Sequence, residues 1–295
     1  MNDFYHIIYN PYANRGGAKR YLDAFVSLLD TRGESYAVHE TTTPGHATLI
    51  TREIISRGAK YIIIMGGDGT VQEVVNGYTE GDDVVFGIIP AGTGNDVSKM
   101  LKIPPALEDV GAVAAIIFEK KIKPVDLIVA ADGTQSVLFY SFGIAASMIV
   151  DMQRYKKKNK MSYHKALIKN LFVFKPGEYE VILDGPSRRY KADFCAVHNC
   201  IHAGSGMSLI KDAVIDDGLV ELLIVENKGF FRRVSNFISI IRKTIHLQPN
   251  VQILPIKDVT INSAEGELCC VAGEIYEVKQ LKLSVRHRAI RMFHG

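Results

Sequence analysis

The stretch Tyr61–Gly77, YIIIMGGDGTVQEVVNG, decides the fold. Tyr61–Ile64 is predicted to be a short buried strand, because its residues are apolar and mostly β-branched. Gly66 and Gly67 then turn the backbone, and a helix with a valine-rich face begins at Thr70. This order predicts a strand, a tight turn and a helix.

The residues of this turn favour a phosphate ligand. Glycine destabilises the interior of an element, so glycines at a strand-to-helix junction indicate a tight turn or a close approach to a ligand. The N–H groups at the start of the helix suit an anion. Asp68 adds negative charge, which fits a phosphate site when a cation bridges the two. We predict a turn for a metal-bound nucleotide phosphate; a purely structural turn is the alternative for this stretch alone.

A second turn of the same kind follows. Val84–Pro90 is predicted as another buried strand, and Ala91–Asp96 (AGTGND) leads into a helix starting near Val97. Asn95 and Asp96 are favourable N-cap residues. Open α/β sheets bind ligands at the carboxyl ends of their strands, so two such turns predict one ligand crevice.

Strands and helices alternate over the first ~120 residues. Phe4–Tyr9 is a predicted strand that ends at Asn10-Pro11, and Arg15–Lys19 is a predicted basic loop before an amphipathic helix. Ser35–Thr41 is a second strand, and a helix follows Pro44-Gly45. The alternation predicts an α/β domain with a largely parallel sheet that is covered on both faces.

The C-terminal half is predicted to be a β-sandwich with a helical insertion at Ala145–Phe174. We place the boundary near residue 125, which gives a nucleotide-binding domain at 1–125 and a substrate and metal domain at 126–295, with room for the last strand to pack back on the first domain. Apolar alternation, as in Leu281 and Leu283, is typical of half-buried antiparallel strands. The predicted strands are Pro124–Ala131, Ser136–Gly143, Glu178–Asp184, Arg189–His198, Leu219–Val225, Val251–Asn262 and Glu267–Val271, with more toward the C-terminus.

The composition is that of a soluble globular protein. The 295 residues are 47% hydrophobic and 23% charged, and the net charge of +3 is too small to indicate nucleic-acid binding. No apolar run approaches the ~20 residues that span a bilayer, and the N-terminus lacks a secretory pattern. The four cysteines show no zinc spacing, so we expect buried thiols and a cytoplasmic protein that is at most peripheral to the membrane.

Several known phosphate and hydrolase motifs are missing from the sequence. It contains no GxxxxGK[ST] loop, no GxGxxG after a strand and no GxSxG elbow. These absences disfavour a Walker-type triphosphatase, a Rossmann dehydrogenase and the common α/β-hydrolase.

Three motifs together resemble the diacylglycerol kinase and sphingosine kinase superfamily. They are Gly66-Gly67-Asp68-Gly69-Thr70, Pro90-Ala91-Gly92-Thr93-Gly94-Asn95-Asp96 and Asp216-Asp217-Gly218-Leu219. Their order and spacing are most similar to the bacterial soluble lipid kinases, which share an NAD kinase-like fold. The first motif also occurs in NAD kinases and phosphofructokinases, so the second and third carry the distinction. The likeness extends over nearly the whole chain.

The resemblance implies transfer of the γ-phosphoryl group of ATP to a lipid hydroxyl in a cleft between the two domains. It implies a catalytic Mg²⁺ acting with Asp68. Phosphoryl transfer depends mainly on positioning and charge neutralisation, which backbone amides and a divalent ion supply. The residues that would hold ATP are Asn10, Thr41, Gly66, Gly67, Asp68, Gly69, Thr70, Gly92 and Thr93.

The resemblance also implies a structural Mg²⁺ site in the second domain. Its ligands would be the Asp217 carboxylate and the backbone carbonyls of Val214 and Leu219, all oxygens suited to a hard cation. From the sequence alone, Asp216-Asp217-Gly218 is a good turn before a strand, and that interpretation stays open.

The catalytic base is where the chain departs from the family. The family carries Asp-Gly-Glu on a late turn, whereas this chain has Ala272-Gly273-Glu274. Glu274 matches the glutamate assigned as proton acceptor, and Ala272 replaces the aspartate. General-base assistance contributes ~10²–10⁴ in rate, so a weakened base need not abolish activity. A lipid kinase is the first choice; a kinase for a soluble acceptor such as NAD and a catalytically impaired nucleotide- or lipid-binding relative are the alternatives.

Two basic segments bear on membrane contact. Basic residues gather between Arg154 and Lys160, and Phe230–Lys243 is both basic and amphipathic. A basic cluster beside an amphipathic helix suits transient binding to anionic lipid. A solvated basic face above a core-facing apolar stripe is the alternative for each. The sequence leaves a homodimer open.

Overall fold

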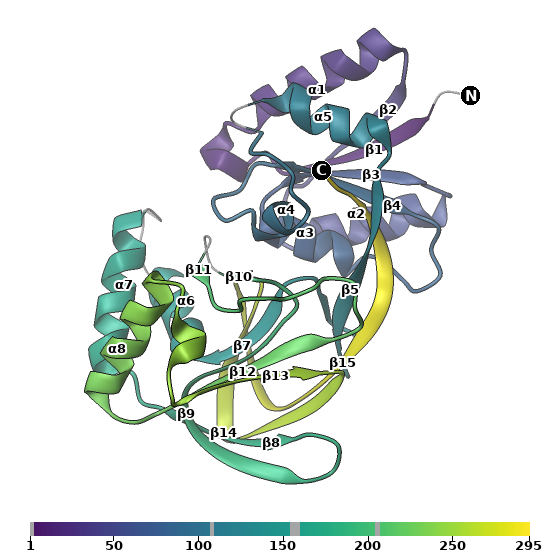
Figure 1. Ribbon diagram of the computed structural model, residues 1–295. Helices are drawn as coiled ribbons and strands as arrows, with labels where there is room; N and C mark the ends of the chain where they lie inside the picture. Colours follow the sequence, from purple (N-terminus) through teal and green to yellow (C-terminus); the bar gives the residue numbers. More distant parts are fainter. Residues whose placement is uncertain (1–2, 107–108, 154–159, 204–206) are drawn as a thin grey trace. The chain divides into compact units, whose positions relative to one another are not determined.

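Buried apolar runs form the central strands of the N-terminal part. In β3 (Tyr61–Gly66) and β4 (Val85–Pro90), nearly every residue is buried, as expected for parallel strands covered on both faces. The computed structural model describes residues 3–106, 109–153, 160–203 and 207–295 (Figure 1). The chain divides into two units, Met1–Leu127 with His287–Gly295 (unit 1) and Ile128–Arg286 (unit 2).

Unit 1 is a parallel α/β layer structure. β1 (Phe4–Tyr9) pairs in parallel with β2 (Ser35–Glu40) and with β3, and β3 pairs in parallel with β4. Helices cover both faces of this sheet: α1 (Lys19–Arg32) packs with α5 (Val110–Glu119), and α2 (His46–Ser56) packs with α3 (Asp68–Val75) on the opposite face (Figure 1). The unit also contains η1 (Ala13–Gly16), α4 (Asp96–Met100) and the first part of β5 (Ile122–Ala130).

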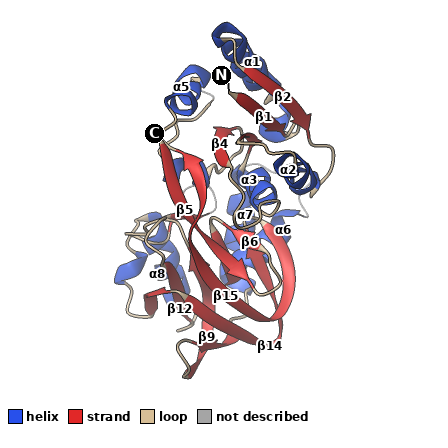
Figure 2. Cartoon of the chain, turned by 90° about the vertical axis from the view of Figure 1, so that its right-hand side faces the viewer, coloured by secondary structure: helices blue, strands red, loops and turns tan. Residues whose placement is uncertain are grey.

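The strand pairs of unit 2 with a defined register are antiparallel. The strands are β6 (Gln135–Ser136), β7 (Phe139–Gly143), β8 (Gly177–Ile182), β9 (Ser187–His198), β10 (His202–Ala203), β11 (Met207–Ser208), β12 (Val220–Glu226), β13 (Val251–Ile256), β14 (Asp258–Val271) and β15 (Glu274–Phe293). The helices α6 (Ile144–Gln153), α7 (Lys160–Val173) and α8 (Phe230–Ile241), with η2 (Ile245–Leu247), lie beside the strands (Figure 2). Near the end of β15, Arg291 and Met292 belong to unit 1 and pair in parallel with β4.

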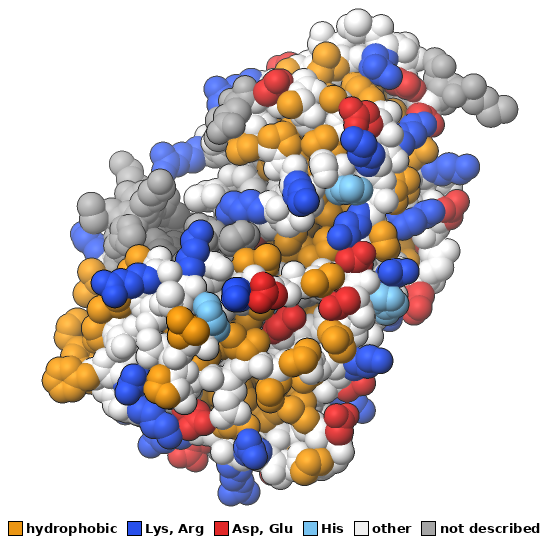
Figure 3. Space-filling view, viewed as in Figure 1, with side chains coloured by type: hydrophobic (Ala, Val, Ile, Leu, Met, Phe, Trp, Pro, Cys, Tyr) orange, Lys and Arg blue, Asp and Glu red, His pale blue; other side chains and the backbone are white. Residues whose placement is uncertain are grey.

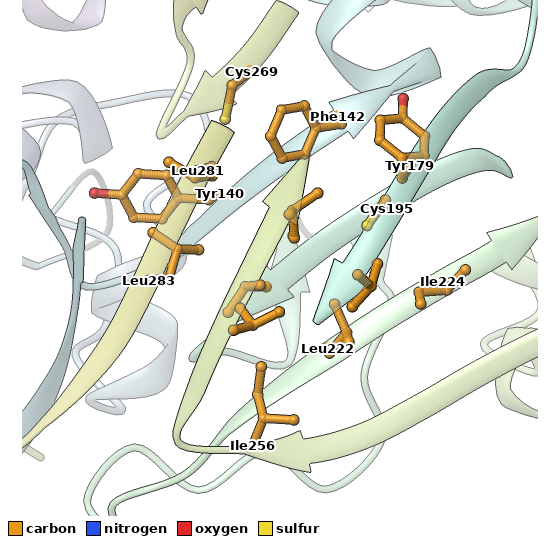
Figure 4. Close-up of a cluster of buried hydrophobic side chains, with 14 of the residues drawn as sticks. Tyr140, Phe142, Tyr179, Cys195, Leu222, Ile224, Ile256, Cys269, Leu281 and Leu283 are labelled. Atoms are coloured by element: carbon orange, nitrogen blue, oxygen red, sulfur yellow. The ribbon is translucent and has the colours of Figure 1, made fainter. Parts of the chain in front are cut away.

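The sheet of unit 2 is barrel-like. The prediction of a β-sandwich is wrong on this point. Its strands are hydrogen-bonded in one continuous order from β13 to β15, with β7 and β8 each bridging β9 and β14. Side chains from all seven of these strands and from β5 meet in one buried cluster, including Tyr140, Leu222 and Leu283 (Figure 4). A single sheet whose strands all contribute to one core must curl around it.

One expected strand is divided in the structure, and two expected segments lie partly outside the described residues. The predicted strand Val251–Asn262 is divided at Lys257 into β13 and β14, and β14 continues through Glu267–Val271 with a register shift. The sequence also favours a helix over Leu107–Phe118, where the structure has α5 (Val110–Glu119); Leu107 and the basic residues 154–158 lie outside the described residues. None of the helices in the described ranges is both long and apolar enough to cross a membrane.

The turn between β14 and β15 is strained at one residue. Val271 and Glu274 are register partners, so Ala272 and Gly273 form a two-residue hairpin turn. Both have positive φ, +48° at Ala272 and +98° at Gly273, as in a type I′ turn. The left-handed region is unfavourable for alanine and is tolerated by asparagine and aspartate. Ala272 is therefore a poor residue for its own backbone conformation.

Replacing Ala272 by asparagine should stabilise the protein by about 0.5–1 kcal/mol, because asparagine favours the first position of this turn. Urea unfolding of Ala272→Asn against the wild type measures the change. Ala131→Asn, at an exposed alanine without positive φ, is the matched control and should not stabilise. A loss of stability in Ala272→Asn would show that the turn does not have this geometry.

Candidate active site

The carboxyl ends of four parallel strands lie at one edge of the unit 1 sheet. Three backbone hydrogen bonds extend the ladder past the strand ends: the N–H groups of Thr41, Asn10 and Ala91 donate to the carbonyl oxygens of Tyr9 (2.9 Å), Met65 (3.0 Å) and Gly66 (2.8 Å). The residues that follow β1, β2, β3 and β4 are therefore brought together. They include most of the residues predicted to hold ATP.

The two glycine-rich turns touch backbone to backbone. A Cβ atom on Gly67 would lie 2.9 Å from the Cα of Gly92, and a Cβ on Gly92 would lie 2.5 Å from the Cα of Gly67. A Cβ on Gly66 would lie 2.4 Å from the Thr70 hydroxyl oxygen. Since real Cβ atoms do not approach so closely, these positions require glycine, and the contact fixes one turn against the other.

Asn10 connects the first strand to the helix after the first turn. Its side-chain amide donates to the hydroxyl of Thr70 at 3.0 Å, and its Oδ1 accepts the N–H of Tyr12 at 3.0 Å. Thr70 is buried, as is Thr41 at the end of β2. Asn10 and Thr70 are thus held in place around the start of α3.

Asn95 occupies the N-cap position of α4, as the sequence predicted, but its side chain closes the second turn and does not bond to the helix. Its Oδ1 accepts the N–H of Gly92 at 2.8 Å, and its Nδ2 donates to the Gly92 carbonyl at 3.0 Å. Asn95 has a φ of +53°, a conformation that asparagine tolerates better than most residues. Thr93, inside the loop that Asn95 closes, is exposed.

Asp68 is the first residue of α3 and carries a perturbed carboxyl group. Its Oδ1 accepts the backbone N–H of Val97 at 3.2 Å, across the two turns. Burial, and then the charge of nearby Asp96, raise the pKa of Asp68 from 3.8 to about 6. Asp96 itself is buried and pairs with Lys99 at 2.9 Å. The sequence showed Asp96 only as a helix-start residue, so its influence on Asp68 was not foreseen.

This arrangement fits a magnesium-bound phosphate. Mg²⁺ in phosphate sites is typically held by one or two carboxylates together with the phosphate oxygens. Asp68 supplies such a carboxylate at a helix N-terminus, where N–H groups lack intrahelical acceptors. Beside Gly69, apart from its two chain neighbours and the backbone of α3, no described heavy atom lies within 4 Å of where a Cβ would stand. Room for a ligand therefore exists at the start of α3.

The residues predicted for a second metal lie in the turn before β12. Asp217 is exposed, and its Oδ1 accepts the N–H of Leu219 at 3.0 Å, as in a structural turn. Burial, and then the charge of Asp217, raise the pKa of Glu221 to about 7, which places another carboxyl group near this turn. Val214 is exposed. Among the described residues, no cluster of three or more His, Cys, Asp or Glu side chains is suited to a metal.

Glu274 begins β15 in unit 2, directly after the Ala272-Gly273 turn. Its side chain is exposed, and its Oε2 accepts the hydroxyl of Tyr276 at 2.7 Å. Burial raises the pKa of Tyr276, so this phenol stays protonated and acts as a donor to Glu274 at neutral pH. Ala272 presents only a methyl group beside it. The sequence analysis did not predict a role for Tyr276. The one feature that could have indicated it is the spacing of two residues from Glu274, which places both side chains on the same side of β15.

Comparisons with known proteins cover both units. Residues 5–130 match the diacylglycerol kinase catalytic domain, and residues 139–294 match the YegS C-terminal NAD kinase beta sandwich-like domain. A Bacillus subtilis protein named diacylglycerol kinase is 30% identical over 78% of this chain and 76% of its own length. A Xanthomonas campestris protein named probable lipid kinase YegS-like is 30% identical over 68% of this chain and 67% of its own.

A solved structure shows the same fold. The crystal structure of a diacylglycerol kinase from Bacillus anthracis has a TM-score of 0.77 at 21% identity and covers 100% of this chain and 97% of that one. The two matched domains and the relative from Bacillus subtilis agree on the assignment. The chain belongs to the bacterial diacylglycerol kinase and YegS-like family of lipid kinases.

Proposed function

We propose that this lipid kinase transfers the γ-phosphoryl group of ATP to the hydroxyl of a diacylglycerol-like lipid. One observation carries the proposal: two interlocked glycine turns hold a desolvated carboxylate, Asp68, at the start of α3. This is an arrangement for a phosphate and a divalent cation. The names of the relatives, diacylglycerol kinase and YegS-like lipid kinase, support the lipid acceptor.

ATP would bind across the carboxyl edge of the unit 1 sheet. The backbone of the Gly66–Thr70 and Gly92–Thr93 segments would face the phosphates, with Asn10 and Thr41 at the neighbouring strand ends. A Mg²⁺ ion held there by Asp68 would offset the charge on the phosphate oxygens. Because Val97 donates to the Asp68 carboxylate, the second turn orients the group that the first turn presents. A structural Mg²⁺ at Val214, Asp217 and Leu219 is part of the same proposal.

Glu274 would act as the general base. Its carboxylate takes the proton of the lipid hydroxyl while that oxygen forms a bond to the γ-phosphorus of ATP. The bond from the γ-phosphorus to the oxygen bridging it to the β-phosphate breaks, and ADP leaves. The Tyr276 hydroxyl, which donates to Glu274 at 2.7 Å, orients the carboxylate. A base of this kind contributes ~10²–10⁴ in rate.

The acceptor is tested by transfer of labelled phosphate from ATP to a panel of diacylglycerols, sphingoid bases and NAD. We expect label in the diacylglycerol product and a loss of 10²–10⁴ in rate in Glu274→Gln. Label in NAD instead would favour the soluble-acceptor alternative. Equal rates for Glu274→Gln and the wild type would remove Glu274 from the mechanism.

Asp68→Asn should lose Mg²⁺-dependent transfer by at least ~10²-fold while the fold becomes more stable at pH 7. The raised pKa means that the folded protein holds the Asp68 proton more tightly than the unfolded chain does. The wild type therefore loses stability as pH rises through 3.8 to about 6. The neutral amide avoids this cost, which is roughly 1–3 kcal/mol.

Urea unfolding at pH 4 and at pH 7.5, with kinase rates at pH 7.5, checks both parts. The stability gain should be present at pH 7.5 and small at pH 4, where the wild-type carboxyl is largely protonated in the fold. Full activity in Asp68→Asn would contradict the role assigned to Asp68, and equal gains at both pH values would contradict the raised pKa of Asp68.

Ala272 decides between an efficient kinase and an impaired relative. Ala272→Asp restores the family's carboxylate, and Ala272→Asn makes the same change of turn residue without the charge. Both should stabilise the hairpin turn, so a difference in activity between them reports on the carboxylate alone. We expect less than tenfold between the two. A rise of tenfold or more in Ala272→Asp only would favour the impaired relative.

A further inference from the structure

α8 is turned with its polar side toward the protein and its apolar side outward. Arg233, Asn236 and Ser239, spaced by three residues, are 8%, 4% and 6% exposed. Phe231 and Ile241 on the same helix are 86% and 65% exposed. An amphipathic helix on a globular protein normally buries the apolar side. The core-facing apolar stripe considered from the sequence is therefore wrong for α8.

A buried ion pair fixes this orientation. The Arg233 guanidinium donates to one carboxylate oxygen of Asp193 from Nη2 at 2.8 Å and from Nε at 3.1 Å. Its Nη1 donates to the carbonyl oxygens of Leu171 at 3.1 Å and Phe174 at 3.0 Å, at the end of α7. Breaking such a buried pair leaves an uncompensated charge, so α8 cannot rotate its apolar side into the core without a large loss.

The exposed apolar side continues from α8 onto its neighbours. The centroid of the Phe230 ring lies 5.0 Å from that of Phe172 on α7 and 5.6 Å from that of Phe231. Hydrophobic side chains gather at the left edge of Figure 3, where Figure 1 draws α8. We call this surface the outer apolar face; it comprises Ile168, Phe172, Val173, Phe230, Phe231, Ile238, Ile241 and Leu247, each at least 39% exposed. Single exposed apolar residues are ordinary, but a contiguous group marks an interaction site.

The surrounding charge is positive. Residues 166–175 and 227–248 contain no Asp or Glu and seven Lys and Arg, one of which is the buried Arg233 that pairs with Asp193. Of these, Lys175, Arg242 and Lys243 are exposed. Lys169 and Lys228 pair with Asp151 and Glu226 from outside the two segments. An aromatic and aliphatic face within basic segments is complementary to an anionic bilayer, where apolar side chains enter the acyl boundary and cations meet the head groups.

We propose that the outer apolar face docks this protein on an anionic membrane, with α8 lying in the plane of the interface. The proposal rests on the proposed function, since a lipid acceptor resides in a bilayer, and it assigns the surface that makes the contact. The inverted orientation of α8 is what presents Phe231 and Ile241 to the lipid. The Arg233–Asp193 pair is a positioning contact for that presentation.

The test is co-sedimentation of the full chain with vesicles, without ATP or acceptor. The wild type should bind vesicles of phosphatidylglycerol and phosphatidylcholine, and bind pure phosphatidylcholine vesicles much more weakly. Phe231→Ser combined with Ile241→Ser should weaken binding to the anionic vesicles by about tenfold or more, because each loses an apolar side chain from the interface. Leu49→Ser, at a residue 62% exposed on α2, is the matched control and should bind like the wild type. Thermal melts of all three confirm that these exposed positions leave the fold intact.

Two results would overturn the proposal. One is unchanged vesicle binding by the double variant. The other is a wild-type dimer that becomes a monomer in the double variant by light scattering, which would make a second copy the occupant.

Kinase activity on short-chain diacylglycerol in detergent micelles separates this proposal from the proposed function. It should be the same in wild type and double variant; its absence in both, with vesicle binding retained, would reject the lipid kinase reaction alone.

Discussion

The contact between Gly67 and Gly92 is the constraint on which the candidate site depends. Each glycine stands where the Cβ of any other residue would overlap the other turn's backbone. The parallel register of β3 and β4 brings the two turns to the same edge, and the missing side chains let them close. That closure sets the Val97 N–H against the Asp68 carboxylate. The turn proposed to bind phosphate is thus built from backbone, and its one charged group is oriented by the other turn.

The same closure makes the ionised form of Asp68 unfavourable in the folded protein. Packing the two turns together removes water from the carboxyl group and sets it near Asp96, so its pKa rises to about 6. Without a bound cation, the fold carries this cost at neutral pH. Residues that lower stability while preparing a site for charge are expected where function requires them. The position of Asp68 is therefore explained by a ligand better than by folding.

The sequence predicted the features that neighbouring residues determine, and it did not predict those that depend on residues far apart in the chain. The turns after β3 and β4 were predicted because glycine and buried β-branched runs act locally, and the structure brings Asn10, Thr70 and Asp68 together. The curl of the unit 2 sheet was not predicted, because alternation as in Leu281 and Leu283 is the same in a sandwich and a barrel. The sequence also left the orientation of α8 undecided. Its apolar period is clear, but which side is buried depends on Asp193, forty residues earlier in the chain.

The structure gives a second consequence to Ala272, the residue that replaces the family's aspartate. From the sequence, the loss of an aspartate concerned only the chemistry beside Glu274. In the structure, Ala272 has a φ of +48° in a two-residue turn, where aspartate or asparagine fits better than alanine. Backbone preference therefore acts against the alanine and cannot account for it. The reason for the alanine has to be sought in what the missing carboxylate would do near Glu274, and an uncharged neighbour leaves that glutamate as the only carboxylate of the turn.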